Sequence, residues 1–352
     1  MAILDKNYFD LAVLILTSIL LGMVATPVAI RLAKKLGIID YPGRTTHQIH
    51  KLPTPRAGGI ALALALVVMF LVNRLWDYPE IIKILLPGAV VFAFGLWDDK
   101  FGMNAPVKLI GQLIAVTILI FSGVRVQFLE NPQFFIQLNS SLAFWLNILI
   151  TYVWMVGITN AMNMVDSMDG LAVGLCQIIS AFFLILGMIS GQAFLVFFST
   201  ILFGVNWGIS FYNHQPAQTC LGDSGAQTLG FLLAAAALIY HPRAFSQASS
   251  WFAPILFFSV PIFDTTLVTI SRALKAQPFY KANLDHTYHR LIEKGWDARR
   301  AVAVLHLAGL IGGLSATCAM YLAPVYANAI FILWMIVFSG FIYFFIKTEK
   351  AI

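Results

Sequence analysis

The sequence predicts an all-α fold, a polytopic integral membrane helix bundle. Its 352 residues are 60% hydrophobic and only 11% charged, whereas a soluble domain carries about 25% charged residues. The mean hydropathy is +0.83. Apolar runs recur along the whole chain, and many of them approach the roughly 20 residues that a membrane-spanning helix needs. Because no long polar stretch separates the runs, we expect one transmembrane domain over residues 1–352.

About eleven transmembrane helices are expected from the lengths of the apolar runs and from the Gly, Pro and charged residues that interrupt them. The runs cover residues 9–30, 58–75, 84–97, 105–122, 144–160, 170–189, 193–211, 223–240, 252–271, 299–322 and 327–346. The third run is the shortest, and the number is ten if it does not span. The first run exceeds a signal-peptide core and has no clear cleavage site, so we expect it to be retained.

The distribution of positive charge predicts the orientation. The net charge is +6, and 17 of the 22 Lys and Arg residues fall in alternate loops on one side of the predicted membrane. The positive-inside rule makes this side cytoplasmic, with the N-terminus outside and the C-terminus inside. The basic charge is therefore explained by orientation, and nucleic acid is not expected as a partner.

The polar motifs lie on this same side, in loops drawn from hydropathy alone. These loops cover about residues 31–57, 98–104, 160–169, 212–223 and 272–298. Polar and ionisable residues at membrane segments are costly and are usually functional. One cytoplasmic active site is therefore expected.

The first of these loops contains the basic segment HKLPTPRAGG, with His50, Lys51 and Arg56 as candidate binding residues. A rigid basic loop offers charge-assisted donors to a phosphate with little ordering entropy to lose. A loop that only sets the orientation of the chain is the alternative.

The segment GLWDDKFG places Asp98 and Asp99 side by side at the end of an apolar run. Carboxylates that bind Mg²⁺ usually share it with substrate phosphates, so the pair predicts a magnesium and phosphate site. Adjacent acids also raise each other's pKa, which suits a proton acceptor. A solvated pair at a helix end, offset by Lys100, is the alternative.

The segment NAMNMVDSMDG carries Asn160, Asn163, Asp166 and Asp169 at intervals of three residues. If the segment is helical, these side chains spread over about half of its circumference and could face one cavity. A polar contact between helices is the alternative interpretation.

Two further acids lie at or within apolar runs. Asp223, in LGDSG, follows a Gly at the start of a run, where it could bind a metal or cap a helix. Asp264, in PIFDT, is inside a run, and a buried hydrogen-bonded role is as plausible as a catalytic one.

The segment DHTYHRL places His286, His289 and Arg290 in a basic loop. The two His residues are three apart and could share a helix face, but a zinc site would need further ligands. A clamp for a pyrophosphate fits these residues better.

These motifs, in this order and with Lys108 after GLWDDKFG, resemble the polyprenyl-phosphate N-acetylhexosamine-1-phosphate transferases, of the glycosyltransferase family 4 type. The resemblance covers about residues 30–310. It implies transfer of a sugar 1-phosphate from a UDP-N-acetylhexosamine to a polyprenyl phosphate, with release of UMP. It also implies dependence on Mg²⁺, with Mn²⁺ as a substitute, a bacterial inner membrane location with the active site facing the cytoplasm, and a homodimer.

The resemblance also implies roles for individual residues. Asp98 and Asp99 correspond to the catalytic pair, and Asp223 to a magnesium ligand, with Asp98 or Asp99 nearby. Asn213 corresponds to a residue associated with the nucleoside. Substrate binding is implied for His50, Lys51, Arg56, Lys108, Asn160, Asn163, Asp166, Asp169, His286, His289 and Arg290.

Three positions depart from the family pattern. Ser167 stands where the family usually has Gly, Cys220 where it often has a Phe that stacks on the base, and Tyr288 inside the histidine motif. The form of the histidine motif favours the N-acetylglucosaminyl branch, or a relative that uses another N-acetylated sugar, over peptidoglycan synthesis. Phospho-N-acetylmuramoyl-pentapeptide transfer is the alternative within the enzyme class, and an ion-coupled secondary transporter is the alternative of another class.

Overall fold

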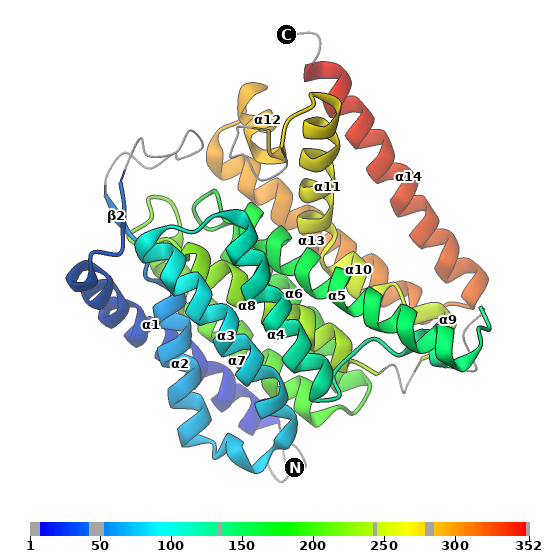
Figure 1. The fold of residues 1–352 in the computed structure, drawn as a ribbon, viewed down its shortest axis with the longest axis horizontal. Coiled ribbons are helices and arrows are strands. Elements are labelled where there is room, and N and C mark those ends of the chain that lie inside the picture. The colour runs from blue at the N-terminus through cyan, green and yellow to red at the C-terminus, as the bar shows by residue number, and fades with distance from the viewer. Residues whose placement is uncertain (1–7, 42–52, 132–135, 242–244, 279–284, 350–352) are drawn as a thin grey trace.

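The computed structural model of this chain describes residues 8–41, 53–131, 136–241, 245–278 and 285–349, and it is a bundle of helices (Figure 1). The helices are α1 (Tyr8–Leu36), α2 (Gly58–Val72), α3 (Pro79–Phe101), α4 (Ala105–Phe121), α5 (Ser140–Val165), α6 (Leu171–Ile189), α7 (Ala193–Asn213), α8 (Gly222–Ile239), α9 (Gln247–Ser250), α10 (Ala253–Phe257), α11 (Ser259–Leu274), α12 (Thr287–Glu293), α13 (Ala298–Ala319) and α14 (Pro324–Glu349). Two 3₁₀ turns, η1 (Leu75–Asp77) and η2 (Phe128–Glu130), and one antiparallel pair of two-residue strands, β1 (Ile39–Asp40) and β2 (Thr54–Pro55), complete it.

The chain is a multi-pass membrane protein, as the apolar runs predicted. Within the described ranges, eight helices are long and apolar enough to cross a membrane, namely α1, α3, α5, α6, α7, α8, α13 and α14. The segment of α9 and α10 forms a bent pair with α11 and could be a ninth span. Helices α2 and α4 are apolar but only 15 and 17 residues long. Eleven spans, and the sides on which the termini lie, stay predictions.

The run expected to be one helix over 252–271 is instead broken, with an angle of 66° between its two parts. The break falls next to Phe258, three residues before Pro261. Proline has no backbone N–H and its ring clashes with the preceding turn, so it favours the first turn of a helix and a break in the chain before it. Pro261 lies in the first turn of α11, and the helix before it ends there.

Helix α3 is longer than the sequence indicated. It begins with Pro79 in its first turn and ends before Gly102, whose φ of 75° no helix can continue. As a result Asp98 and Asp99 belong to the last turn of α3, and not to a loop that begins at residue 98. Their positions are therefore set by a rigid helix.

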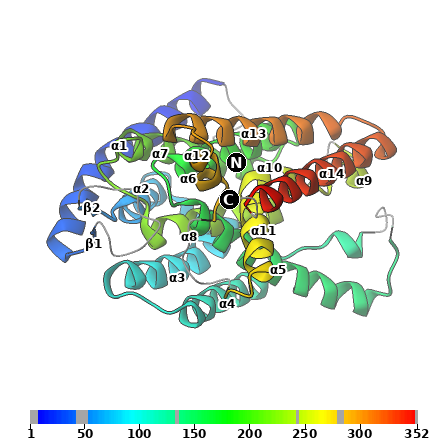
Figure 2. The ribbon, with the colours of Figure 1, turned by 90° about the horizontal axis from the view of Figure 1, so that it is seen from above.

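Helix α8 lies at the centre of the bundle and α14 at its edge (Figures 1 and 2). Of the apolar window of α8, 83% is buried, against 6% for α14. Helix α8 begins with GDSGAQTLG, and such small residues let neighbouring backbones approach closely in membranes. The exposed apolar side chains of α14 are suited to contact lipid.

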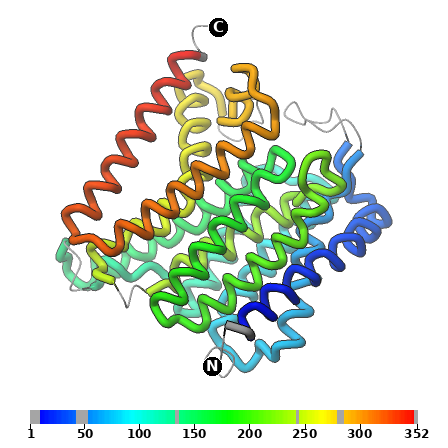
Figure 3. The backbone as a smooth tube through the Cα atoms, turned by 180° about the vertical axis from the view of Figure 1, so that it is seen from behind, coloured from blue at the N-terminus to red at the C-terminus, as the bar shows by residue number. Residues whose placement is uncertain are grey.

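Helix α12 and the strand pair lie at the same end of the bundle (Figure 3). The C-terminal end of α3 contacts the N-terminal end of α8 through Gly95, where an added Cβ would come within 2.6 Å of the Ser224 Cα. This contact brings the last turn of α3 to the start of α8. Polar segments from distant parts of the chain meet there.

Gly95→Ala is expected to destabilise the protein by about 2 kcal/mol and to reduce activity, because overpacking forces backbone shifts. Gly157→Ala is the matched control, because a Cβ at Gly157 on α5 meets nothing within 4 Å. Thermal unfolding in detergent would compare the two variants with the wild type. Equal stability of all three would contradict the role given to this close approach.

Candidate active site

The two adjacent acids of α3 have different partners. The Asp98 carboxylate forms an ion pair with the Lys108 ammonium and accepts a hydrogen bond of 2.5 Å from the Met103 N–H. Successive helical residues point about 100° apart, so Asp99 faces another element. Asp98 and Asp99 are both buried, at 5% and 7% exposure.

Asp99 binds the N-terminus of α8. Its Oδ1 accepts from the Asp223 N–H at 2.8 Å, and its Oδ2 accepts from the N–H and the hydroxyl of Ser224 at 3.0 and 2.5 Å. The first N–H groups of a helix lack partners within it, and an acid there also interacts favourably with the helix dipole. Asp99 thus caps α8 from a neighbouring helix, while Leu221 at the N-cap position has no capping side chain.

The first position of α8 requires glycine. Gly222 has a φ of 70°, and a Cβ there would lie 2.7 Å from the Asp99 Oδ1. The conformation and the close approach both exclude a larger residue. The capping role considered for Asp223 thus belongs to Asp99, and the Asp223 carboxylate is available for other contacts.

The Asp223 carboxylate is the meeting point of three helices. Its Oδ1 accepts hydrogen bonds from Lys108 Nζ at 3.1 Å, Asn163 Nδ2 at 2.8 Å and Gln227 Nε2 at 3.1 Å. Lys108 also pairs with Asp98, so one ammonium bridges the two carboxylates. Asp98 on α3 and Asp223 on α8 therefore share the ammonium group of Lys108.

Two glutamines extend this network and were not among the predicted site residues. Gln112 on α4 donates to Gln227 at 2.9 Å, and its amide exchanges hydrogen bonds with that of Asn160. Each follows a predicted residue by four positions, Gln112 after Lys108 and Gln227 after Asp223. This spacing puts both members of a pair on one helix face, which was the signal available in the sequence.

The carboxylates of this network are compatible with binding of Mg²⁺. Among the residues that the structure describes, no group of three or more His, Cys, Asp or Glu side chains is arranged to hold a metal ion. Mg²⁺, however, is usually bound by one or two carboxylates together with waters and substrate phosphates. Asp98 and Asp223 satisfy this requirement because they already share one cation, the Lys108 ammonium.

The remaining acids of NAMNMVDSMDG do not continue the helix. Helix α5 ends at Val165, so Asp166 and Asp169 lie in the turn that follows it. Burial, together with the charges of Asp223, Asp99 and Asp169, raises the pKa of Asp166 well above its usual value. Asp169 Oδ2 accepts from the Ala217 N–H at 3.1 Å. This turn thus places further acidic groups beside the network.

Asn213 ties two loops together. Its Oδ1 accepts from the Gly170 N–H at 3.2 Å and its Nδ2 donates to the Thr219 carbonyl at 2.9 Å, and the residue is 2% exposed. These bonds fix the loop before α8 against the turn after α5. A contact of Asn213 with a nucleoside stays a prediction.

The first basic loop offered three candidate residues. The structure describes Arg56, whereas His50 and Lys51 lie outside the described residues. The Arg56 guanidinium donates to Asp40 at 2.8 Å and lies 3.6 Å from the Asp99 Oδ1. Burial opposes its charge, but the carboxylates of Asp40 and Asp99 outweigh this and raise the pKa of Arg56. Arg56 thus places a permanent positive charge beside the Asp99 carboxylate.

The histidine segment forms a second cluster. His286 Nδ1 lies 2.8 Å from Asp264 Oδ2, and the other oxygen of Asp264 accepts from the Thr287 N–H at 2.7 Å. A carboxylate bonded to one nitrogen of a His sets its tautomer and ring orientation. Asp264 is therefore the residue that orients His286, which agrees with the buried, hydrogen-bonded interpretation of PIFDT.

Arg290 and Arg272 anchor this cluster. Arg290 donates to the carbonyls of Asp285 and Phe345 and to the Ser271 hydroxyl, which ties α12 to α11 and α14. Arg272 binds the Asp285 carboxylate at 2.8 and 2.9 Å. Burial would raise the pKa of Asp285, but the hydrogen bonds and charge of Arg272 lower it below its usual value. Binding of a diphosphate by Arg290 stays a prediction.

The structure thus joins most of the predicted residues in two clusters. The first contains Arg56, Asp98, Asp99, Lys108, Asn160, Asn163 and Asp223, and the second contains His286, His289 and Arg290. Asp166 and Asp169, which were also predicted, lie in the turn after α5.

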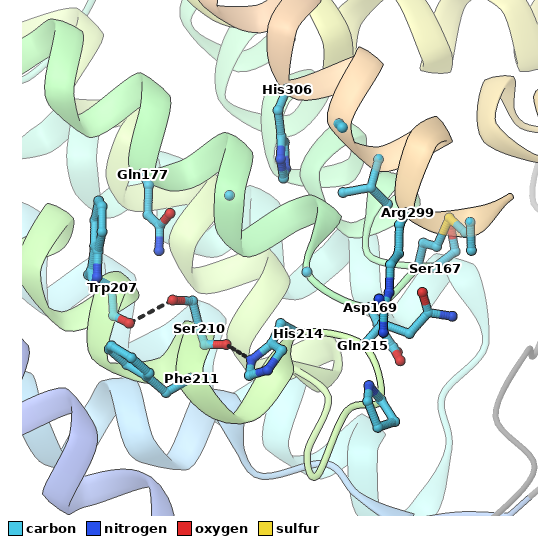
Figure 4. Close-up of a pocket in the computed structure, with 17 residues that line it drawn as sticks. Ser167, Asp169, Gln177, Trp207, Ser210, Phe211, His214, Gln215, Arg299 and His306 are labelled. Atoms are coloured by element: carbon cyan, nitrogen blue, oxygen red, sulfur yellow. Dashed lines mark hydrogen bonds between the residues drawn. The ribbon is translucent and has the colours of Figure 1, made fainter.

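A cavity of about 860 Å³ adjoins the same turn and lies between α6, α7 and α13 (Figure 4). Ser167, Asp169 and Gln215 line it on the loop side, and Arg299 and His306 project into it from α13. Cavities of this size accept ligands as large as nucleotides. None of the carboxylates of α3 and α8 lines it, so it is a neighbouring space and not the acidic cluster itself.

A multi-pass helix bundle with acids, a lysine and amides converging at one end has the features of a membrane enzyme that handles anionic substrates. The model of glycosyl transferase family 4 matches residues 81–241. The chain is 31% identical over 313 residues to a protein of Bacillus subtilis (strain 168) named "Probable undecaprenyl-phosphate N-acetylglucosaminyl 1-phosphate transferase", covering 89% of this chain and 86% of the relative. The chain belongs to glycosyl transferase family 4.

Two further relatives represent different acceptors and sugars. A decaprenyl-phosphate N-acetylglucosaminephosphotransferase of Mycobacterium tuberculosis (strain ATCC 25618 / H37Rv) is 30% identical over 349 residues, covering 90% of this chain and 84% of the relative. A phospho-N-acetylmuramoyl-pentapeptide-transferase of Lacticaseibacillus paracasei is 26% identical over 296 residues, covering 80% and 88%. The similarity to the N-acetylglucosaminyl type is the stronger, as the histidine motif predicted.

Proposed function

We propose that the protein transfers N-acetylglucosamine 1-phosphate from UDP-N-acetylglucosamine to undecaprenyl phosphate or a similar polyprenyl phosphate. The products are a polyprenyl diphosphate sugar and UMP, and the reaction is the first membrane step of a cell-envelope glycan. The relatives of the N-acetylglucosaminyl type support the substrates. The observation that carries the proposal is the convergence of Asp98 and Asp223 on Lys108, since it makes a site for a cation and phosphates.

The acceptor phosphate is the nucleophile. The second pKa of a phosphate monoester is about 6, so it is mostly dianionic at neutral pH and needs little deprotonation. Its oxygen attacks the sugar-linked phosphorus of the donor, and the bond from this phosphorus to the bridging oxygen breaks as UMP leaves. Because the acceptor is already nucleophilic, transfer is direct and forms no aspartyl phosphate.

The residues of the site reduce the repulsion between the two anionic substrates. Asp223 and Asp98 would hold Mg²⁺, which when bound would neutralise charge on the diphosphate. Lys108 and Arg56 add positive charge on two sides of the acids. Asn163 and Gln227 hold the Asp223 carboxylate in one orientation.

The donor would lie across the turn after α5. Its nucleoside would occupy the cavity beside Ser167, Asp169 and Gln215, near the loop that Asn213 fixes. Its diphosphate would lie between the carboxylate network and the histidine segment, where His286 and His289 are held in place. The prenyl chain would remain in the bilayer.

The site would face the cytoplasm of a bacterial cell, at the inner membrane, where UDP-sugars are available. The bias of Lys and Arg supports this orientation. A homodimer is a further part of the proposal. Labelling of single cysteines introduced at Asp77 and Asp297, which lie at exposed positions of opposite loops, would test the orientation in intact cells.

The assay that tests the function uses purified protein, undecaprenyl phosphate and Mg²⁺ with radiolabelled UDP-N-acetylglucosamine or UDP-N-acetylmuramoyl-pentapeptide. We expect a lipid-linked product and UMP with the first donor only, and none after EDTA. Product only with the second donor would establish the muramoyl-pentapeptide function instead. Solute transport without lipid product would favour a carrier, and a phosphorylated enzyme formed from the donor alone would overturn direct transfer.

A further inference from the structure

Three side-chain amides connect α5, α4 and α8 through a continuous series of hydrogen bonds that ends on the Asp223 carboxylate. Asn160 lies on α5, Gln112 on α4 and Gln227 on α8. Gln112 and Gln227 are only 2% and 3% exposed. Burying polar groups inside a membrane protein is costly, so amides that bond to one another between helices indicate a function. These three residues are called the amide link below.

The carboxylate at one end sets the direction of the amide link. The Lys108 ammonium pairs with Asp223 Oδ1, and an ionised carboxylate can only accept hydrogen bonds. Gln227 Nε2, 3.1 Å from this oxygen, therefore donates to it, and Gln227 Oε1 accepts from Gln112 Nε2 at 2.9 Å. A Gln227 amide turned the other way would face Asp223 with its oxygen, and two acceptors would meet.

The other end of the amide link gives the same direction independently. Asn160 Nδ2 donates to the Val156 carbonyl at 2.8 Å, which can only accept, and to Gln112 Oε1 at 2.7 Å. Asn160 Oδ1 accepts in return from Gln112 Nε2 at 3.2 Å. The two ends therefore agree on the orientation of every amide. Both N–H bonds of the Asn160 amide are used within the protein.

The amide link ends on one particular oxygen of Asp223. This oxygen, Oδ1, accepts from Gln227 Nε2 at 3.1 Å, from Asn163 Nδ2 at 2.8 Å and from Lys108 Nζ at 3.1 Å. A carboxylate oxygen has about two acceptor sites, so Oδ1 is fully used by donors of the protein. A divalent cation would therefore be bound through the other oxygen, Oδ2.

We propose that the amide link fixes the rotation of the Asp223 carboxylate, with Oδ1 committed to the protein and Oδ2 offered to a divalent cation. Gln112 and Gln227 are positioning residues, because they act through Asp223. Asn160 anchors the amide link and does not contact substrate. The inference rests on the proposed function, which gives Asp223 the role of a Mg²⁺ ligand.

Binding of Mn²⁺, a paramagnetic substitute for Mg²⁺, tests the amide link without the reaction. Purified protein is titrated with Mn²⁺ in the presence of UMP, because carboxylates usually share such a cation with a phosphate, and free Mn²⁺ is measured by electron paramagnetic resonance. Gln227→Leu is expected to weaken Mn²⁺ binding about 10-fold or more, the scale of losing a partner of a metal ligand. Gln112→Leu is expected to weaken it about 3-fold to 10-fold, the equivalent of one hydrogen bond.

The double variant distinguishes a connected link from two independent contacts. It is expected to bind Mn²⁺ as Gln227→Leu does, because Gln112 acts on Asp223 only through Gln227. Additive losses in the double variant, or wild-type Mn²⁺ affinity in Gln112→Leu, would overturn the proposal. A purely structural role of Gln112 would give the second result, with a lower midpoint of thermal unfolding alone. Gln112→Met, which keeps the length of the side chain, has the same expected effect and serves if Gln112→Leu does not fold.

Gln192→Leu is the matched control. The Gln192 amide makes two hydrogen bonds with the backbone of His241, at the opposite end of α7 and α8 from Asp223. This variant is expected to keep the Mn²⁺ affinity of the wild type, and an equal loss of affinity would overturn the assignment to the amide link.

The proposed function fails separately from the amide link. A wild-type protein that binds Mn²⁺ but forms no lipid-linked sugar would refute the transfer reaction and leave the amide link in place. A wild-type protein that binds no Mn²⁺ in the presence of UMP would overturn the role given to Asp223 Oδ2.

Discussion

Asp223→Asn is expected to reduce sugar-phosphate transfer by about 10³-fold, the upper range for losing one preorganised electrostatic contact. The Asp223 carboxylate receives hydrogen bonds from Lys108, Asn163 and Gln227. An amide at this position has no negative charge, and its NH₂ group would face donors. The rate of lipid-linked sugar formation at saturating substrates, measured over a range of Mg²⁺ concentrations, would show both the loss and a weaker dependence on Mg²⁺.

The control for this variant is Asp77→Asn. Asp77 is an exposed acid in η1, just before the start of α3, whereas Asp98 lies in the last turn of that helix. The control variant makes the same chemical change away from the network and is expected to retain wild-type turnover. A Mg²⁺ titration with the same midpoint in Asp223→Asn as in the wild type would remove Asp223 as a metal ligand, whatever the rate.

Asp99→Ala and Asp98→Asn are expected to separate stability from catalysis. Asp99→Ala removes three hydrogen bonds at the start of α8 and leaves the Asp223 and Ser224 N–H groups without their acceptor. Loss of a fully buried charged partner costs about 3 kcal/mol, so this variant is expected to lose both thermal stability and activity. Asp98→Asn keeps an acceptor for the Met103 N–H and is expected to lose activity only.

Thermal unfolding in detergent and turnover at neutral pH, measured on the same preparations, would test this separation. Wild-type turnover in Asp98→Asn would end any essential role for that carboxylate. A stable, inactive Asp99→Ala would show that Asp99 acts in the reaction and does not serve mainly as the cap of α8.

The helices were largely predictable because the lengths of the apolar runs follow from the thickness of the bilayer. The run predicted over 193–211 became α7, Ala193–Asn213, and the run over 105–122 became α4. The two larger differences have local causes. Pro261 broke one run, and α3 continued through Asp98 and Asp99 to Gly102 although these residues are polar. A prediction from hydropathy ends a helix where charged residues begin. The backbone hydrogen bonds of a helix, however, do not require apolar side chains.

The division of roles within the site could not be predicted in the same way. Asp98 and Asp99 are equivalent in the sequence, and Asp223 and Asp264 each allowed two interpretations. Which acid caps a helix, which orients a His and which meets the Lys108 ammonium depends on tertiary contacts. Some of these join residues more than 100 positions apart, such as Asp99 with Ser224. Side-chain direction and helix packing decide these contacts, and composition carries no information about them.

The sequence by itself determined that this is a multi-pass membrane protein with polar motifs typical of glycosyl transferase family 4, because hydropathy and motif chemistry are local properties. Only the tertiary structure decided that Lys108 joins Asp98 to Asp223, that Asp99 caps α8, and that Asp264 holds His286. These pairings exist because small residues such as Gly95 let α3 and α8 pack closely, and because α12 is anchored by Arg290. Each such pairing depends on the relative placement of whole helices, which no single stretch of the chain specifies.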